Sequence, residues 1–172
     1  MDEVIEEHYE EKKDRPPFLI VLLVLTALNL ISSLYSSITG LLSAKPVVNK
    51  EEVLGPDFEN AMEELSAQEG GEEAISILDG IMNHLFYLMN EGYYSNLVLQ
   101  LITVLVGVAA VVMLFKLKKL GFHLYLIYTL LGVFGVYLIM PAALVSGIML
   151  FFIAILGGIM VLLYAINFKH LK

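Results

Sequence analysis

The stretch PFLIVLLVLTALNLISSLYSSITGLL, residues 17–42, decides the class of this protein. It carries no charged residue, and it is longer than the about 20 residues that an α-helix needs to cross the hydrocarbon core of a bilayer. Its second half is unusual, because an amide, four serines and a threonine occur between Asn29 and Gly40. We predict a transmembrane helix here, with polar groups that are candidates for a site.

Three further stretches have the length and composition of membrane spans. Of the 172 residues, 58% are hydrophobic, and the mean hydropathy of +0.78 is well above that of soluble domains. We place the four spans at residues 17–42, 95–115, 122–140 and 145–168. The sequence therefore predicts an all-α integral membrane protein whose four transmembrane helices form a bundle. The first span is longer than the apolar part of a signal peptide, so we expect an uncleaved anchor.

The segments between the spans differ in charge and length. We predict an acidic tail at residues 1–16, a connector at 43–94, a basic turn at 116–121, a short turn at 141–144 and a tail at 169–172. In the connector, Pro56 stands where a helix begins, and the Gly70–Gly71 pair ends the helical pattern. A second helix is predicted from about Glu72 to Asn90. Its apolar residues fall on more than one side, so we expect it to pack on the span ends or lie in the headgroup layer.

Lys and Arg predict the orientation of the chain in the membrane. Two of them, Lys45 and Lys50, lie on the connector side of a four-span topology, and eight lie on the other side: Lys12, Lys13, Arg15, Lys116, Lys118, Lys119, Lys169 and Lys172. Basic residues close to spans favour the cytoplasmic side, whereas acidic residues contribute little. We therefore predict that both termini are cytoplasmic and that the acidic connector lies outside.

Polar and small residues follow one face of each of the first three spans. On the first span this face holds Thr26, Asn29, Ser33, Ser36, Ser37 and Gly40, which fall within about 100° of arc on a helical wheel. On the second it holds Asn96, Gln100, Thr103, Gly107 and Ala110. On the third it holds Gly121, Tyr125, Thr129 and Gly132, which we interpret as a close-packing row.

Two interpretations of the polar faces on spans one and two compete. They bond to each other and hold the helices together, or they enclose an outward-opening cavity for a small polar ligand. Helix-to-helix bonding is favoured, because no Asp, Glu, Lys or Arg occurs inside a span, whereas ion pathways and charged-substrate sites usually contain one. The candidate site residues for the second interpretation are Asn29, Ser33, Ser36, Gln100 and Thr103.

Motifs for catalysis or metal binding are missing from the sequence. The chain has no Cys, its four His residues are dispersed, and its Glu pairs are typical of solvated helix faces. No basic stripe is present that would neutralise nucleic-acid phosphates. We expect a non-enzymatic protein with no catalytic residue, cofactor or metal site. Its expected partners are the lipid bilayer and other membrane proteins or further copies of this chain, and not nucleic acid.

Three stretches carry a resemblance to a known family: RPPFLIVLLVLTALNLISSL at residues 15–34, FKLKKLGFHLYLIY at 115–128 and LLYAINFKHLK at 162–172. Their basic-Pro entry, Lys-rich turn and basic ending resemble the uncharacterised small four-span inner-membrane proteins of Bacteroidota-type bacteria. The resemblance implies a bacterial inner (cytoplasmic) membrane location. That family has no established activity, so no site residue is implied.

We expect the first of two functions and keep the second as the alternative. The first is an accessory or scaffold subunit of an inner-membrane assembly, because the spans are uncharged and the connector offers helices for docking. The second is a small transporter or ligand-binding membrane protein with a polar cavity between spans one and two. The two hypotheses differ in whether the polar faces touch or are separated by a gap.

Overall fold

The structure is a computed structural model that describes residues 16–172, so the predicted acidic tail lies almost entirely outside the described residues. Over this range the chain is helical and contains no strand. Four helices are long and apolar enough to cross a membrane: α1 (Pro17–Leu42), α4 (Tyr93–Phe115), α5 (Lys119–Phe134) with the 3-10 turn η1 (Gly135–Leu138), and α6 (Gly147–Ile166) with η3 (Phe168–His170). The prediction of an all-α protein with four such helices is confirmed for the described residues.

The ends of the third and fourth helices depart from the predicted spans. The α-helical part of the third span ends at Phe134, six residues before its predicted end, and tightens into η1. A second 3-10 turn, η2 (Ala142–Leu144), follows, and α6 begins at Gly147. Pro141 prevents a helix from continuing past Met140, because proline has no amide hydrogen to donate and disfavours helical geometry in the residue before it.

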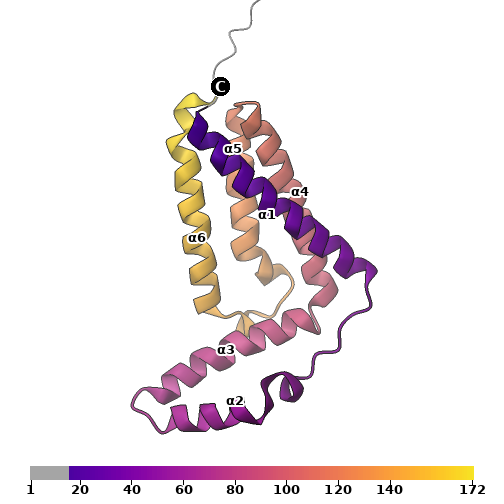
Figure 1. The fold of residues 1–172 in the computed structure, drawn as a ribbon, viewed down its shortest axis with the longest axis vertical. Helices are drawn as coiled ribbons and strands as arrows, with labels where there is room; N and C mark the ends of the chain where they lie inside the picture. Colours follow the sequence, from indigo (N-terminus) through magenta and orange to yellow (C-terminus); the bar gives the residue numbers. More distant parts are fainter. Residues whose placement is uncertain (1–15) are drawn as a thin grey trace, which may run out of the picture.

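The four long helices run alternately up and down through the bundle (Figure 1). Helix α4 packs against both α1 and α5, and α5 packs against α6. Helix α1 crosses the others obliquely: it starts beside the end of α6 and finishes beside the start of α4 (Figure 1). At 1.5 Å per residue its 26 residues span about 39 Å, and a helix of that length fits a ~30 Å hydrocarbon core when it is tilted.

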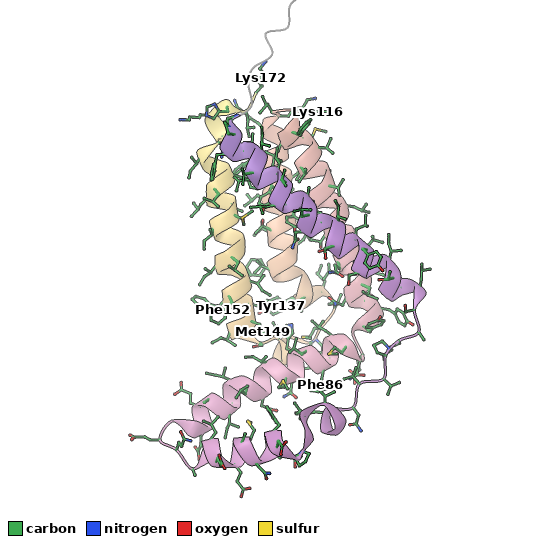
Figure 2. All side chains as sticks on the ribbon, viewed as in Figure 1. Phe86, Lys116, Tyr137, Met149, Phe152 and Lys172 are labelled. Atoms are coloured by element: carbon green, nitrogen blue, oxygen red, sulfur yellow. The ribbon has the colours of Figure 1, made fainter. Side chains whose placement is uncertain are left out.

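One end of the bundle collects the lysines of the described chain that lie outside the connector. The backbone amide of Lys172 donates to Leu117, and the amide of Lys119 donates to the carbonyl of Lys172, so the chain end is paired with the α4–α5 turn. Figure 2 shows Lys116 and Lys172 at this end. We call it the basic end; it is defined by Lys116, Lys118, Lys119, Lys169 and Lys172.

A cluster of buried side chains lies near the basic end. Leu19, Leu114 and Tyr164 are completely buried there, and they belong to one cluster contributed by α1, α4 and α6. Gly121 allows the α4–α5 turn to close, because a Cβ atom at this position would lie 2.5 Å from the backbone nitrogen of Leu114. The basic end is therefore sealed by side chains and by backbone contact.

Helices α2 (Lys50–Ser66) and α3 (Gly71–Met89) lie at the opposite end (Figure 1). The backbone of α2 is broken at Gly55, whose φ of 63° and ψ of 170° are not helical, so the regular helix starts at Pro56. Helix α3 passes across the ends of the long helices. The hydroxyl of Tyr87 donates to the carbonyl of Ile139 over 3.0 Å, which ties α3 to the connection between α5 and α6.

Candidate functional site

The two predicted polar faces meet at one point. Ser37 of α1 is completely buried, and its hydroxyl lies 2.9 Å from Oε1 of Gln100 on α4. The same hydroxyl lies 2.8 Å from the carbonyl oxygen of Ser33, so one proton is shared between two acceptors. Here the polar residues connect two helices, as the helix-to-helix interpretation predicts.

Elsewhere the polar faces separate. Asn29 is exposed, and its Oδ1 lies 3.4 Å from the hydroxyl of Tyr128 on α5, which is longer than an ordinary hydrogen bond. Ser36 is exposed and belongs to no cavity wall described below. Thr103 is buried, and its hydroxyl donates to the carbonyl of Leu99 in its own helix. The structure therefore divides the five candidate residues between different environments.

A cavity of about 470 Å³ lies among α1, α4, α5 and α6. Its wall includes Asn29, Thr103, Tyr128 and Gly157, each within about one residue of the middle of its helix. Most of the wall is apolar. We call this cavity the middle chamber, because it lies halfway along every long helix of the bundle.

Towards the basic end the middle chamber is closed by a polar contact. The hydroxyls of Thr26 and Tyr164 lie 2.8 Å apart and are both buried. The ring of Tyr125 packs on that of Tyr164, with centroids 4.4 Å apart. Tyr164 was not among the residues predicted from the sequence. A Tyr inside an apolar span could have indicated it, because a buried Tyr hydroxyl normally requires a hydrogen-bond partner.

Part of the row of small residues on α5 lines the middle chamber and does not pack closely against a neighbouring helix. Thr129 and Gly132 both belong to the chamber wall. A Cβ atom at Gly132 would meet no heavy atom within 4 Å, whereas one at Gly107 of α4 would lie 2.5 Å from Leu30. Within the predicted row, the close-packing interpretation holds for Gly121, whereas at Gly132 the missing side chain leaves open space.

A second cavity of about 280 Å³ lies between the long helices and α3. Its wall includes Ser33, Asn96 and Gln100 from the predicted polar faces, and His84 and Leu88 from α3. Met149, at the α3 side of α6 in Figure 2, lines it as well. We call it the α3 chamber. The two chambers adjoin, because both are lined by Thr103, Tyr128, Gly132 and Ile153.

His84 is the histidine in the wall of the α3 chamber. It is 4% exposed, and its Nδ1 accepts a hydrogen bond from the backbone amide of Ser146 over 3.1 Å. Burial lowers the pKa of His84 from its usual 6.5, so the ring is neutral at pH 7. Because Nδ1 is an acceptor, the single ring proton is on Nε2. Sequence reasoning placed His84 on a connector helix and gave it no role, since its position over the bundle depends on how α3 docks.

The chambers offer hydrogen bonds and apolar surface to a ligand. No Asp, Glu, Lys or Arg is among the described residues that line them, and no group of three His, Asp or Glu within the described range has a metal-binding arrangement. Comparisons of the chain with protein-family models, with curated proteins and with solved structures find no match. The chemistry of the site is therefore inferred from its geometry.

Proposed function

We propose that this protein is a small, non-enzymatic membrane protein that binds a ligand in the middle and α3 chambers. The observation that carries the proposal is the middle chamber itself, which occupies the halfway point of four long apolar helices. Its volume of about 470 Å³ lies within the range of small-molecule sites.

The distribution of charge supports an orientation with both termini cytoplasmic, in the bacterial inner membrane that the family resemblance implies. The described Asp and Glu residues all belong to positions 51–91, around α2 and α3, whereas five lysines surround the opposite end. Basic residues favour the cytoplasmic side of a span. In this orientation the basic end faces the cytoplasm and α3 covers the outer ends of the spans.

Ligand binding is favoured over ion-coupled transport or catalysis by the chemistry of the walls. Charged residues within membranes mark proton relays and ion pathways, and the described walls of both chambers have none. The hydroxyls and amides that are present can orient a ligand without ionising. The proposed role is therefore recognition or carriage of a molecule within the bilayer.

Native mass spectrometry tests the proposal with a cavity-filling variant. Gly132→Phe places a ring in open space at the junction of the chambers, and Gly158→Phe is the matched control, because Gly158 also has open space around it but lines neither chamber. The wild type and Gly158→Phe should retain a molecule of defined mass after mild extraction, and Gly132→Phe should not. Equal retention by all three, or none by the wild type, contradicts the proposal.

A second candidate function is an accessory or scaffold subunit that docks through α2 and α3. The turn between these helices projects past α6 in Figure 1, and Ile77 of α3 is 41% exposed. A partner subunit should then co-purify at fixed stoichiometry and be lost on Ile77→Glu. A monomer that retains a ligand and has no partner would favour the first function.

A further inference from the structure

We propose that the ligand is a neutral amphiphile taken from the bilayer, with an apolar tail in the middle chamber and an uncharged, oxygen-bearing head in the α3 chamber. This inference rests on the proposed ligand-binding function and specifies the class of ligand. Four features of the molecule carry it: the position of the opening, the character of each chamber, and the glycine between them.

The opening of the middle chamber lies on the side of the bundle. Its wall residues Leu25 on α1 and Leu156 on α6 are 54% and 67% exposed. The two helices are joined near the basic end by the Thr26–Tyr164 contact and diverge beyond it (Figure 1). Because Leu156 lies at the middle of α6, the opening faces the hydrocarbon core when the helices span a bilayer. A molecule dissolved in the bilayer reaches it directly.

The wall of the middle chamber suits an alkyl or isoprenoid chain. Three threonine hydroxyls line it, and each is already bonded: Thr26 to the hydroxyl of Tyr164 over 2.8 Å, Thr103 to the carbonyl of Leu99 over 2.8 Å and Thr129 to the carbonyl of Tyr125 over 3.0 Å. Thr103 and Thr129 therefore have no hydroxyl proton left to donate to a ligand. An apolar tail gains contact with the apolar side chains around them.

The α3 chamber supplies hydrogen-bond donors for a head group. Within residues 16–172, the side-chain amide of Asn96 and the Nε2 group of Gln100 have no hydrogen-bond partner, and the ring proton of neutral His84 is on Nε2. Donors select a head with acceptor oxygens, such as an ester, a hydroxyl or a quinone carbonyl. No described Lys or Arg lines the chamber, so a phosphate would be buried without a counter-charge at high cost.

Gly132 lies where the two chambers join. It belongs to both walls, and open space surrounds the position that a side chain would occupy. A large side chain there blocks the passage between the chambers without displacing a neighbour at its Cβ. A ligand that extends from one chamber to the other is therefore excluded by Gly132→Phe.

The test uses two photoreactive probes in vesicles that contain the whole protein. The first is a monoacylglycerol with a diazirine in its chain, and the second is a lysophosphatidylglycerol with the same chain and an anionic head. The neutral probe should label residues of α5 and α6 that line the middle chamber at least about tenfold more strongly than the anionic probe, because the phosphate of the anionic probe would be buried without a counter-charge. A decyl-tailed benzoquinone should compete if the head is a quinone, and unlabelled monoacylglycerol if it is a glyceride; competition by either supports the inference.

Variants distinguish the site from ordinary lipid contact. Gly132→Phe should abolish the preference for the neutral probe, and Gly158→Phe should keep it. Asn96→Leu removes a donor that has no protein partner, so the fold is retained and labelling should fall about tenfold. Equal labelling by both probes, or labelling insensitive to Gly132→Phe, overturns the inference. If mass spectrometry finds a Gly132-dependent ligand with a charged head, ligand binding stands and the neutral class is wrong.

Discussion

Ser37 of α1 and Gln100 of α4 place their side-chain oxygens 2.9 Å apart in the interior of the bundle. Eight residues earlier on α1, Asn29 faces α5 instead of α4, and its Oδ1 lies 3.4 Å from the hydroxyl of Tyr128. The cause is the oblique path of α1 across the bundle (Figure 1). The same polar face therefore joins two helices at one end and lines a cavity at the other.

The Ser37–Gln100 contact should be measurable as a coupling between two substitutions. Ser37→Ala and Gln100→Leu each remove one partner, and a double-mutant cycle of unfolding free energies isolates their interaction. We expect about 0.6 kcal/mol, and at most about 2 kcal/mol, as for hydrogen bonds between membrane helices. The pair Ser36→Ala with Gln100→Leu is the control, because Ser36 is exposed, and it should be additive. Additivity in the Ser37 cycle would show that the contact contributes nothing.

Two glycines on α5 should respond oppositely to alanine. At Gly121 a methyl group would lie 2.5 Å from the backbone nitrogen of Leu114, so α4 and α5 must shift and stability should fall by about 1–3 kcal/mol. At Gly132 the methyl group meets nothing within 4 Å, and alanine should leave stability unchanged or raise it by up to about 1 kcal/mol. Thermal unfolding in one detergent compares the two. Equal losses would mean that Gly132 is packed as closely as Gly121.

The docking of α3 should weaken in acid because of His84. Its pKa is lowered by burial, and protonation of Nδ1 would also break the bond from Ser146. Above pH 6.5 the ring is neutral in both the folded and unfolded states, and its contribution to stability is fully present. Below that value the unfolded state takes up a proton that the folded state does not, so stability decreases as the pH falls towards the lowered pKa.

Unfolding temperatures at about pH 7.5 and about pH 5.5 measure this effect, since the usual histidine pKa of about 6.5 lies between them. His84→Gln should flatten the dependence. His123 is the matched control, because it is exposed on α5 and its Nδ1 lies 3.0 Å from the carbonyl of Lys119 in its own helix. His123→Gln should keep the pH dependence of the wild type; if it removes the dependence and His84→Gln does not, the effect belongs to the basic end.

The proposed orientation predicts which positions a membrane-impermeant thiol reagent can reach. The chain has no native Cys, so single substitutions have no background. Ser66→Cys, at the end of α2, should be labelled from outside in intact cells, and Lys118→Cys, in the α4–α5 turn, should be labelled only after the membrane is opened. The reverse pattern would place the basic end outside.

Most of the helical architecture was predictable because it depends on local composition. Residues 17–42 form one helix with the predicted ends, since an uncharged apolar run of that length satisfies its backbone hydrogen bonds only as a helix in a membrane. The early end of α5 was not predicted. Residues 135–138 are as apolar as those before them, so composition does not mark the change to 3-10 geometry, and the bond from Tyr87 to the carbonyl of Ile139 beside them comes from a distant segment.

The candidate site was predicted in its residue types and only partly in its arrangement. Asn29, Ser33, Gln100 and Thr103 do line the two chambers, whereas Ser36 does not. Tyr128, Tyr164 and His84 complete the site from helices far away in the sequence, and no helical wheel of a single span shows which of them will face Asn29.

The sequence by itself determined four apolar helices, a polar face on each of the first two, and the difference in charge between the two ends of the bundle. Each of these depends on the composition or the helical periodicity of single segments. Only the tertiary structure decided that the two polar faces touch at Ser37 and Gln100 and separate at Asn29. It also decided that His84 lines the α3 chamber. The crossing angle of α1 and the docking of α3 set these relationships. Both arise from packing between segments that are far apart in the sequence, so the pattern of any one segment does not show them.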